Sequence, residues 1–332
     1  MNRLKIYDRD YLTAKVRLRK GEKKFAKEAG VVEKLEDIKK HRAPYVLFGI
    51  KEDVGVLANY GIKGTSDAWD ACLKALLNMQ ANTLTKPESI VILGDLDFSK
   101  EMRIASMLDP DGENFGETIG KLVEQIDLEV SQLVRFIVSA GKIPVAIGGG
   151  HNNALGLLKG CSDALGGPVN VVNMDAHSDF KALTHRHSGN AFSYAMEKGY
   201  LNKYAIFGIH KCYTAQEVYT RMEQFKNRIG FYFFEDIILR ENPPFHQAVK
   251  VAKQFIRERK FGLEIDMDAI EGFPASAATP TGFTMTQARQ FARFFSKNPL
   301  PSYIHICEAI PEKSEFNTVG KGLASLVLDL TA

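Results

Sequence analysis

The chain has little that would place it in a membrane, outside the cell or on nucleic acid. No apolar run in its 332 residues approaches the roughly 20 residues that a membrane-spanning helix requires. The first residues, 1–5, lack the apolar centre of a signal peptide. Its 4 cysteines show no close-paired spacing, which is typical of free thiols in a reducing compartment. A net charge of +3 is too small to indicate nucleic acid. We therefore expect a cytoplasmic protein with neither a membrane nor a nucleic acid as partner.

The rest of the composition is that of an ordinary globular protein, with 45% hydrophobic and 25% charged residues. Apolar runs of strand length recur along the chain, and most are separated by helical patterns such as those at 68–77 and 119–137. This alternation predicts a parallel sheet with helices on both faces. We predict one three-layer α/β/α catalytic domain over 44–332, after an N-terminal extension over 1–43. The expected strands are 45–50, 89–93, 143–147, 169–173, 204–209, 231–234, 262–265 and 303–307.

Three clusters of histidine and aspartate residues follow directly on three of these apolar runs. Because open α/β sheets bind ligands at the carboxyl ends of their strands, the clusters are expected to meet there. Alternate residues of an extended segment face the same way, so the spacing within each cluster places its side chains together. Four aspartates and two histidines suit hard or borderline divalent cations, and bridging carboxylates suit a pair of them. The candidate ligands are His151, Asp175, His177, Asp179, Asp266 and Asp268.

These segments resemble the metal motifs of the arginase/ureohydrolase superfamily. The matching segments are 148–151, 175–179 and 266–268, and the resemblance extends from about Tyr45 to the C-terminus. The Gly-Gly-Gly-His form of the first motif and the segment Ser188–Phe192 resemble the formimidoylglutamase branch rather than arginase proper. The resemblance implies an arginase-like fold with an eight-stranded parallel sheet.

The resemblance also implies how the ligands divide between two ions. His151, Asp175, Asp179 and Asp266 would hold one ion, and Asp175, His177, Asp266 and Asp268 the other, with Asp175 and Asp266 bridging. It implies two Mn²⁺ per subunit, although the oxygen-rich donor set alone also permits nickel, cobalt or iron. Such a pair of cations makes water a nucleophile at neutral pH by lowering its pKa.

Glu308 follows the last predicted strand and matches the substrate-facing glutamate of the superfamily. A carboxylate there would bind a planar amidinium or guanidinium through paired hydrogen bonds; a surface glutamate at a strand end is the alternative. In arginase, a proton-shuttling histidine occupies the position of Phe192. The formimidoylglutamase branch has phenylalanine at this position, as this sequence does. Because phenylalanine cannot move a proton, we assign the proton relay to the catalytic residue Asp179, with His185 and His187 as substitutes.

The loop after the second metal motif carries two cations, Lys181 and Arg186, that are expected at the mouth of the pocket. They would bind the carboxylates of a small-molecule substrate, although a solvated loop charge is the alternative for each. His187 and Asn190 lie in the same loop and complete the predicted substrate-binding set. Asn59 and the segment 210–213 are further candidates for the pocket wall, although turn formation explains the glycines around Asn59 equally well.

The predicted activity is that of a hydrolase acting on carbon–nitrogen bonds other than peptide bonds in linear amidines. The preferred reaction converts N-formimidoyl-L-glutamate and water into L-glutamate and formamide, a step of histidine degradation. An arginase, agmatinase or guanidino-acid ureohydrolase releasing urea is the alternative, and a non-catalytic metal-binding homologue is a third. A zinc deacetylase is disfavoured because six ligands support two ions. Relatives in this superfamily are often trimers or hexamers, so we also consider a homo-oligomer.

Overall fold

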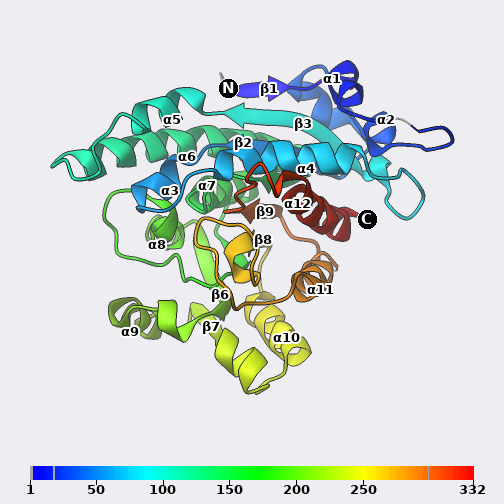
Figure 1. The fold of residues 1–332 in the computed structure, drawn as a ribbon. Coiled ribbons are helices and arrows are strands. Elements are labelled where there is room, and N and C mark those ends of the chain that lie inside the picture. The colour runs from blue at the N-terminus through cyan, green and yellow to red at the C-terminus, as the bar shows by residue number, and fades with distance from the viewer. Residues whose placement is uncertain (1–2, 18, 298) are drawn as a thin grey trace.

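The computed structural model describes residues 3–17, 19–297 and 299–332. Its centre is one nine-stranded sheet with the order β1-β3-β2-β4-β9-β8-β5-β6-β7. In Figure 1 the sheet extends from β1 and β3 at the top to β7 near the bottom. The strands are β1 (Leu4–Ile6), β2 (Tyr45–Lys51), β3 (Ile90–Asp97), β4 (Ile143–Ile147), β5 (Val169–Met174), β6 (Leu201–Ile209), β7 (Ile229–Phe233), β8 (Phe261–Asp266) and β9 (Tyr303–Cys307).

All eight predicted strands form, and they pair in parallel with one another. The prediction of a purely parallel, eight-stranded sheet is nevertheless wrong, because β1 adds a ninth strand. It pairs antiparallel with β3, with Leu4 opposite Leu96 and Ile6 opposite Gly94. Gly94 has a φ of 142°, and a Cβ there would lie 1.8 Å from the carbonyl oxygen of Lys5, so β1 can approach only because this position is glycine. The predicted N-terminal extension therefore contributes one strand, Leu4–Ile6, to the sheet of the main domain.

Helices cover both faces of the sheet and bury two separate apolar cores. One face carries α4, α10, α11 and α12, and the other carries α3, α5, α6, α7, α8 and α9. The three-layer prediction is confirmed. The helices are α1 (Arg9–Ala14), α2 (Phe25–Glu28), α3 (Val54–Ala58), α4 (Ala68–Leu77), α5 (Ser99–Ala105), α6 (Phe115–Ser139), α7 (Asn153–Leu165), α8 (Ala191–Glu197), α9 (Gln216–Gln224), α10 (Phe245–Ile256), α11 (Met285–Phe295) and α12 (Phe316–Thr331).

The longest helix, α6, shows how the spacing of apolar residues determines which side of a helix packs on the sheet. Its apolar residues recur every three or four positions, so one stripe faces the sheet, while its charged residues other than the buried Asp127 lie on the opposite side. Helix α7 packs along α6 through Gly156 and Gly160, where a Cβ would lie 2.8 Å and 2.4 Å from backbone oxygens of α6. Within the described residues, no helix is both long and apolar enough to cross a bilayer.

Candidate metal centre and active site

Four adjacent strands, β4, β9, β8 and β5, carry the site at their carboxyl ends. His151 follows β4, Glu308 follows β9, Asp266 ends β8, and Asp175 follows β5. These residues are far apart in the chain, but their strands are neighbours in the sheet. Because the strands are parallel, their ends meet at one edge, as the sequence predicts.

The first group of donor atoms surrounds the ring of His151. Its Nδ1 lies 3.2 Å from Asp175 Oδ2, 2.9 Å from Asp179 Oδ2 and 3.0 Å from Asp266 Oδ2. The four ligand atoms lie within 4.8 Å of one another. One imidazole N–H cannot serve three carboxylates, and both ring nitrogens are buried without a hydrogen bond of good geometry. A divalent cation among these four atoms would satisfy them together, so the donor set fits one.

The second group contains Asp175, His177 and Asp268. His177 Nδ1 lies 2.9 Å from Asp268 Oδ2 and 3.7 Å from Asp175 Oδ1. Asp175 is therefore common to both groups, with one carboxylate oxygen facing each. Asp266 is absent from the second group, and its Oδ1 accepts the N–H of Asp268 at 2.9 Å. A bridging role for Asp175 agrees with this geometry, whereas bridging by Asp266 stays a prediction.

Crowding of carboxylates shifts the pKa values throughout the centre. Burial raises the pKa of Asp175 to about 6, and the charge of Asp179 adds to the rise. Burial also raises the pKa of Asp266 well above its ordinary value, with further contributions from Asp268 and Asp175. Burial opposes protonation of His177, but the negative charge of Asp268 outweighs it and raises the pKa of His177 to about 11. So much buried negative charge requires compensation, which divalent cations supply.

Glu264 is a fully buried residue of β8, and its carboxylate lies on the Nε2 side of the His151 ring. Its Oε2 accepts a hydrogen bond from His305 at 2.7 Å and lies 3.5 Å from His151 Nε2, while Tyr303 donates to Oε1 at 2.7 Å. Burial opposes ionisation, but His305 and His151 lower the pKa of Glu264 to about 2. A carboxylate behind a ligating histidine fixes the orientation of its ring. Sequence reasoning missed Glu264, although a charge inside an apolar strand, two residues before Asp266, is a usable signal.

Glu52 holds the loop that presents His151. This buried carboxylate accepts hydrogen bonds from Gly150 N at 2.9 Å and Asn153 Nδ2 at 2.6 Å. Gly149 has a φ of 72°, and a Cβ there would lie 2.4 Å from Asn153 Nδ2, so only glycine fits. Burial raises the pKa of Glu52. The sequence analysis did not select Glu52, although its position directly after β2 marks it as a strand-end acid.

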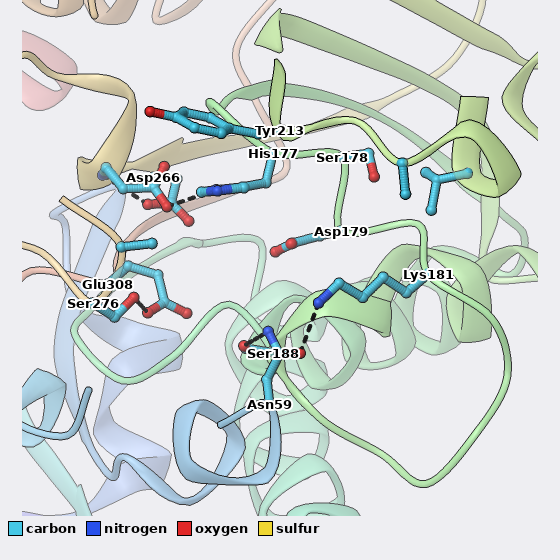
Figure 2. Close-up of a pocket in the computed structure, with 14 residues that line it drawn as sticks. Asn59, His177, Ser178, Asp179, Lys181, Ser188, Tyr213, Asp266, Ser276 and Glu308 are labelled. Carbon is cyan, nitrogen blue, oxygen red and sulfur yellow. Dashed lines mark hydrogen bonds and ion pairs between the residues drawn. The ribbon is translucent and has the colours of Figure 1, made fainter. Parts of the chain in front are cut away.

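A cavity of about 170 Å³ opens onto the donor groups. Figure 2 shows Glu308 and Ser276 on one side of it and Lys181 on the other, with Asp179 between them. Lys181 Nζ donates to Asn59 Oδ1 at 2.9 Å, and Asn59 donates to Ser188 at 3.2 Å. The cavity therefore has a carboxylate at one side and an ammonium at the other. Its wall also contains Asn59, Ser188 and Tyr213.

Glu308 is buried and held in an unusual backbone conformation. Its φ is 64°, and that of Asp179 is 45°, both in the left-handed region that costs a non-glycine residue about 1–3 kcal/mol. Glu308 Oε1 accepts the N–H of His151 at 2.5 Å, and Oε2 accepts the hydroxyl of Ser276. Burial raises the pKa of Glu308 to about 8, although these hydrogen bonds oppose the rise. A buried carboxylate with one lone pair left on each oxygen is suited to a cationic, planar ligand.

Arg186 does not lie at the pocket mouth, contrary to the expectation from sequence. It is 1% exposed and bonds to Asp127 on α6 through Nε at 2.9 Å and Nη2 at 3.2 Å. It also donates to the carbonyl oxygen of Asn152 at 3.0 Å and to Asn190 Oδ1 at 2.5 Å. Arg186 therefore fixes the loop to α6 and α7 and has no free face for a substrate.

His187 and Asn190 also lie outside the cavity lining. His187 Nδ1 accepts the N–H of Gly189 at 3.1 Å, and burial lowers the pKa of His187 to about 3, so it stays neutral. Asn190 donates to the carbonyl oxygen of His185 at 2.9 Å. Phe192 is fully buried, stacks on Tyr204 at 4.2 Å and packs edge-on against His151 at 5.2 Å. His187, Asn190 and Phe192 therefore pack behind the candidate metal ligands and do not line the cavity.

Replacing Arg186 with lysine is expected to lower stability without changing substrate affinity. Lysine keeps the charge but cannot reproduce the fork on Asp127 or the bonds to Asn152 and Asn190. We expect a loss of about 2 kcal/mol in the free energy of unfolding, measured by denaturant titration, with KM unchanged well below the unfolding temperature. A raised KM at unaltered stability would restore a substrate-binding role to Arg186.

The chain matches the model of the Arginase family over residues 43–329. This match covers most of the chain, which therefore belongs to the arginase family. The position of the donor residues at the carboxyl ends of β4, β5 and β8 is consistent with that membership.

The individual relatives share only low sequence identity with this chain. The formimidoylglutamase of Geobacillus thermodenitrificans is 27% identical over 266 residues, covering 78% of this chain and 74% of the relative. The crystal structure of Trypanosoma cruzi formiminoglutamase with Mn²⁺ superposes with a TM-score of 0.74 at 15% identity, covering 93% and 97% of the two chains. A hypothetical agmatinase from Burkholderia thailandensis reaches a TM-score of 0.66 at 16% identity, covering 90% and 87%. The fold is thus common to proteins named for amidine and for guanidine substrates.

Proposed function

We propose that this protein is a binuclear manganese hydrolase that splits N-formimidoyl-L-glutamate into L-glutamate and formamide. The observation that carries the proposal is the placement of Glu308 and Lys181 on opposite sides of one small cavity, with the metal donor Asp179 between them. Such a cavity matches a molecule with a cationic amidine at one end and carboxylates at the other. The curated relatives named formimidoylglutamase support this choice.

The six donor residues fit two divalent cations, and the manganese in the Trypanosoma cruzi formiminoglutamase supports Mn²⁺. His151, Asp175, Asp179 and Asp266 would hold one ion. Asp175, His177 and Asp268 would hold the other. When bound, such ions neutralise the carboxylates and supply a water molecule of lowered pKa. An aspartate-rich donor set without cysteine favours Mn²⁺ over softer metals.

The protein residues then have separate tasks. Glu308 holds the amidinium through paired hydrogen bonds, with Ser276 and the N–H of His151 fixing its two oxygens. Lys181 binds a carboxylate of the glutamate part, and Asn59 orients the lysine. Asp179, which lines the cavity between them, carries a proton to the nitrogen that departs with glutamate. The oxygen of water stays on the former amidine carbon, which leaves as formamide.

The second candidate is a ureohydrolase acting on a guanidino acid, because Glu308 and Lys181 would bind such a molecule as well. Phe192 argues against an arginase-type proton shuttle, since it is buried against Tyr204 and carries no titratable group. A panel of amidine and guanidine substrates, assayed with Mn²⁺ for formamide and for urea, separates the two. We expect formamide release from formimidoylglutamate. Faster urea release from a guanidino acid would replace the proposal with the second candidate.

Replacing Lys181 with alanine is expected to raise KM about 5-fold for substrates with carboxylates and to change kcat less. The lysine is exposed, so its charge-assisted hydrogen bond is worth only about 1 kcal/mol. Steady-state kinetics on formimidoylglutamate gives the effect, and an N-alkylformamidine without carboxylates is the control substrate. Equal effects on both substrates would show that Lys181 supports the pocket rather than the carboxylate.

A further inference from the structure

A separate group of possible metal ligands lies at the carboxyl ends of β6 and β7, at the same edge of the sheet as the binuclear centre, and shares no residue with that centre. It contains His210, Cys212 and Glu235, whose ligand atoms lie within 4.8 Å of one another. His210 follows β6, Cys212 lies in the short turn Lys211–Tyr213, and Glu235 begins the π-helical turn after β7. Because β6 and β7 are parallel neighbours, their ends bring the three residues together.

The imidazole and the carboxylate of this group are already fixed. The ring of His210 is stacked between Phe234 at 4.5 Å and Tyr213 at 5.1 Å, with interplanar angles of 6° and 21°. Glu235 Oε1 accepts the N–H of Lys211 at 3.0 Å. Such restraints reduce the entropy that two of the three donors would lose on binding a ligand.

Glu235 also has an oxygen without a partner. Its Oε2 is buried and makes no hydrogen bond. The nearby cations do not neutralise it, because Lys211 Nζ pairs with Asp236 at 2.6 Å and Arg240 pairs with the same carboxylate at 3.0 Å. A buried carboxylate oxygen without a donor is costly, and a cation beside it removes that cost.

The thiol of Cys212 completes the set. Cys212 is the exposed cysteine of the chain, whereas Cys72, Cys161 and Cys307 are buried. Its Sγ already lies within 4.8 Å of the ligand atoms of His210 and Glu235. One nitrogen, one sulfur and one oxygen donor suit a tetrahedral, thiophilic divalent cation such as Zn²⁺, with the fourth position open to water.

We propose that His210, Cys212 and Glu235 form a separate site for one thiophilic divalent cation of the Zn²⁺ class. Its donor set differs from the cysteine-free binuclear centre, so the two sites select different metals. The site adjoins the cavity through Tyr213, whose ring stacks on His210 at 5.1 Å and on His177 at 5.5 Å. Tyr213 also bonds to Thr279 at 3.1 Å. An ion on His210 would therefore fix the turn that carries this wall residue.

The test uses full-length protein loaded with Mn²⁺ and titrated with Co²⁺, whose bond to a thiolate gives a charge-transfer absorption. We expect the band to saturate at one Co²⁺ per chain and to disappear when Zn²⁺ is added. Cys212→Ser should abolish the band, and Glu235→Gln should weaken Zn²⁺ binding at least about 10-fold. Asp236→Asn, which removes the adjacent carboxylate, is the matched control and should keep the site.

Absence of the band in wild-type protein, or its persistence in Cys212→Ser, would overturn the proposal. Persistence would place the ion on Cys307, which lies near His151 and His305. Weakening in Asp236→Asn to the same degree as in Glu235→Gln would show general electrostatic attraction instead of coordination. Because the readout is an absorption and not turnover, the result is independent of the proposed hydrolase activity.

Discussion

Replacing Asp175 with alanine is expected to empty both metal positions and to stop turnover. Its carboxylate belongs to both donor groups, with Oδ2 facing His151 and Oδ1 facing His177. Without it, neither group keeps enough oxygen donors for a divalent cation. Loss of the ions removes about 4 kcal/mol or more of transition-state stabilisation, which corresponds to roughly 10³-fold in kcat/KM. Elemental analysis and steady-state kinetics on Mn²⁺-supplied protein measure both effects.

Two neighbouring variants serve as graded controls for this prediction. Asp268→Ala removes a donor of the second group alone, so the ion beside His151 should remain. Asp266→Ala removes a donor of the first group, so the ion beside His177 should remain if Asp266 serves one ion, and be lost as well if Asp266 bridges. Circular dichroism of each variant checks that the fold persists. Two ions retained by Asp175→Ala, or both lost from Asp268→Ala, would contradict the division of ligands that the geometry indicates.

Replacing Glu308 with glutamine is expected to reduce kcat/KM by roughly 10- to 150-fold, or about 1.5–3 kcal/mol, because a charge-assisted pair with the amidinium is lost. Glutamine has nearly the same shape: its oxygen can still accept the N–H of His151, and its amide nitrogen can donate to the hydroxyl oxygen of Ser276. Metal content should stay at the wild-type level, since Glu308 belongs to neither donor group. Steady-state kinetics with formimidoylglutamate, together with elemental analysis, provides the measurement.

Ser276→Ala is the matched control for Glu308, since it removes one supporting hydrogen bond and keeps the charge. A typical hydrogen bond contributes about 1 kcal/mol, so this variant should lose only about 5-fold in kcat/KM. Wild-type turnover by Glu308→Gln would show that the carboxylate does not bind the substrate. Loss of metal in the same variant would show that Glu308 supports the centre instead.

The sequence predicted that the candidate metal ligands lie together, and they do, because strand ends are local features of a sequence. His151, Asp175 and Asp266 each lie at or just after the end of an apolar run, and parallel strands bring such ends to one edge. The spacing of two between Asp175 and His177 placed both on one face. The same rule also points to Glu52, which directly follows β2, and to Glu264, which is a charged residue inside β8.

The prediction for Arg186 could not have been corrected from local sequence. Its partner Asp127 lies on α6, and nothing in the loop indicates that the chain folds back onto that helix. A cation next to a metal motif suggests a ligand contact, but here packing against α6 and α7 decides its role. Strand β1 was missed for a similar reason, because three residues carry too weak a pattern and its pairing depends on Gly94 in β3.

In the proposed reaction, water attacks the amidine carbon and the carbon–nitrogen bond to glutamate breaks. The most direct measurement incubates Mn²⁺-loaded protein with N-formimidoyl-L-glutamate in ¹⁸O-water and identifies the products by mass spectrometry. We expect equal amounts of unlabelled L-glutamate and formamide carrying ¹⁸O, with no reaction by Asp175→Ala. Release of ammonia with N-formylglutamate, or no reaction by the Mn²⁺-loaded wild-type protein, would contradict it.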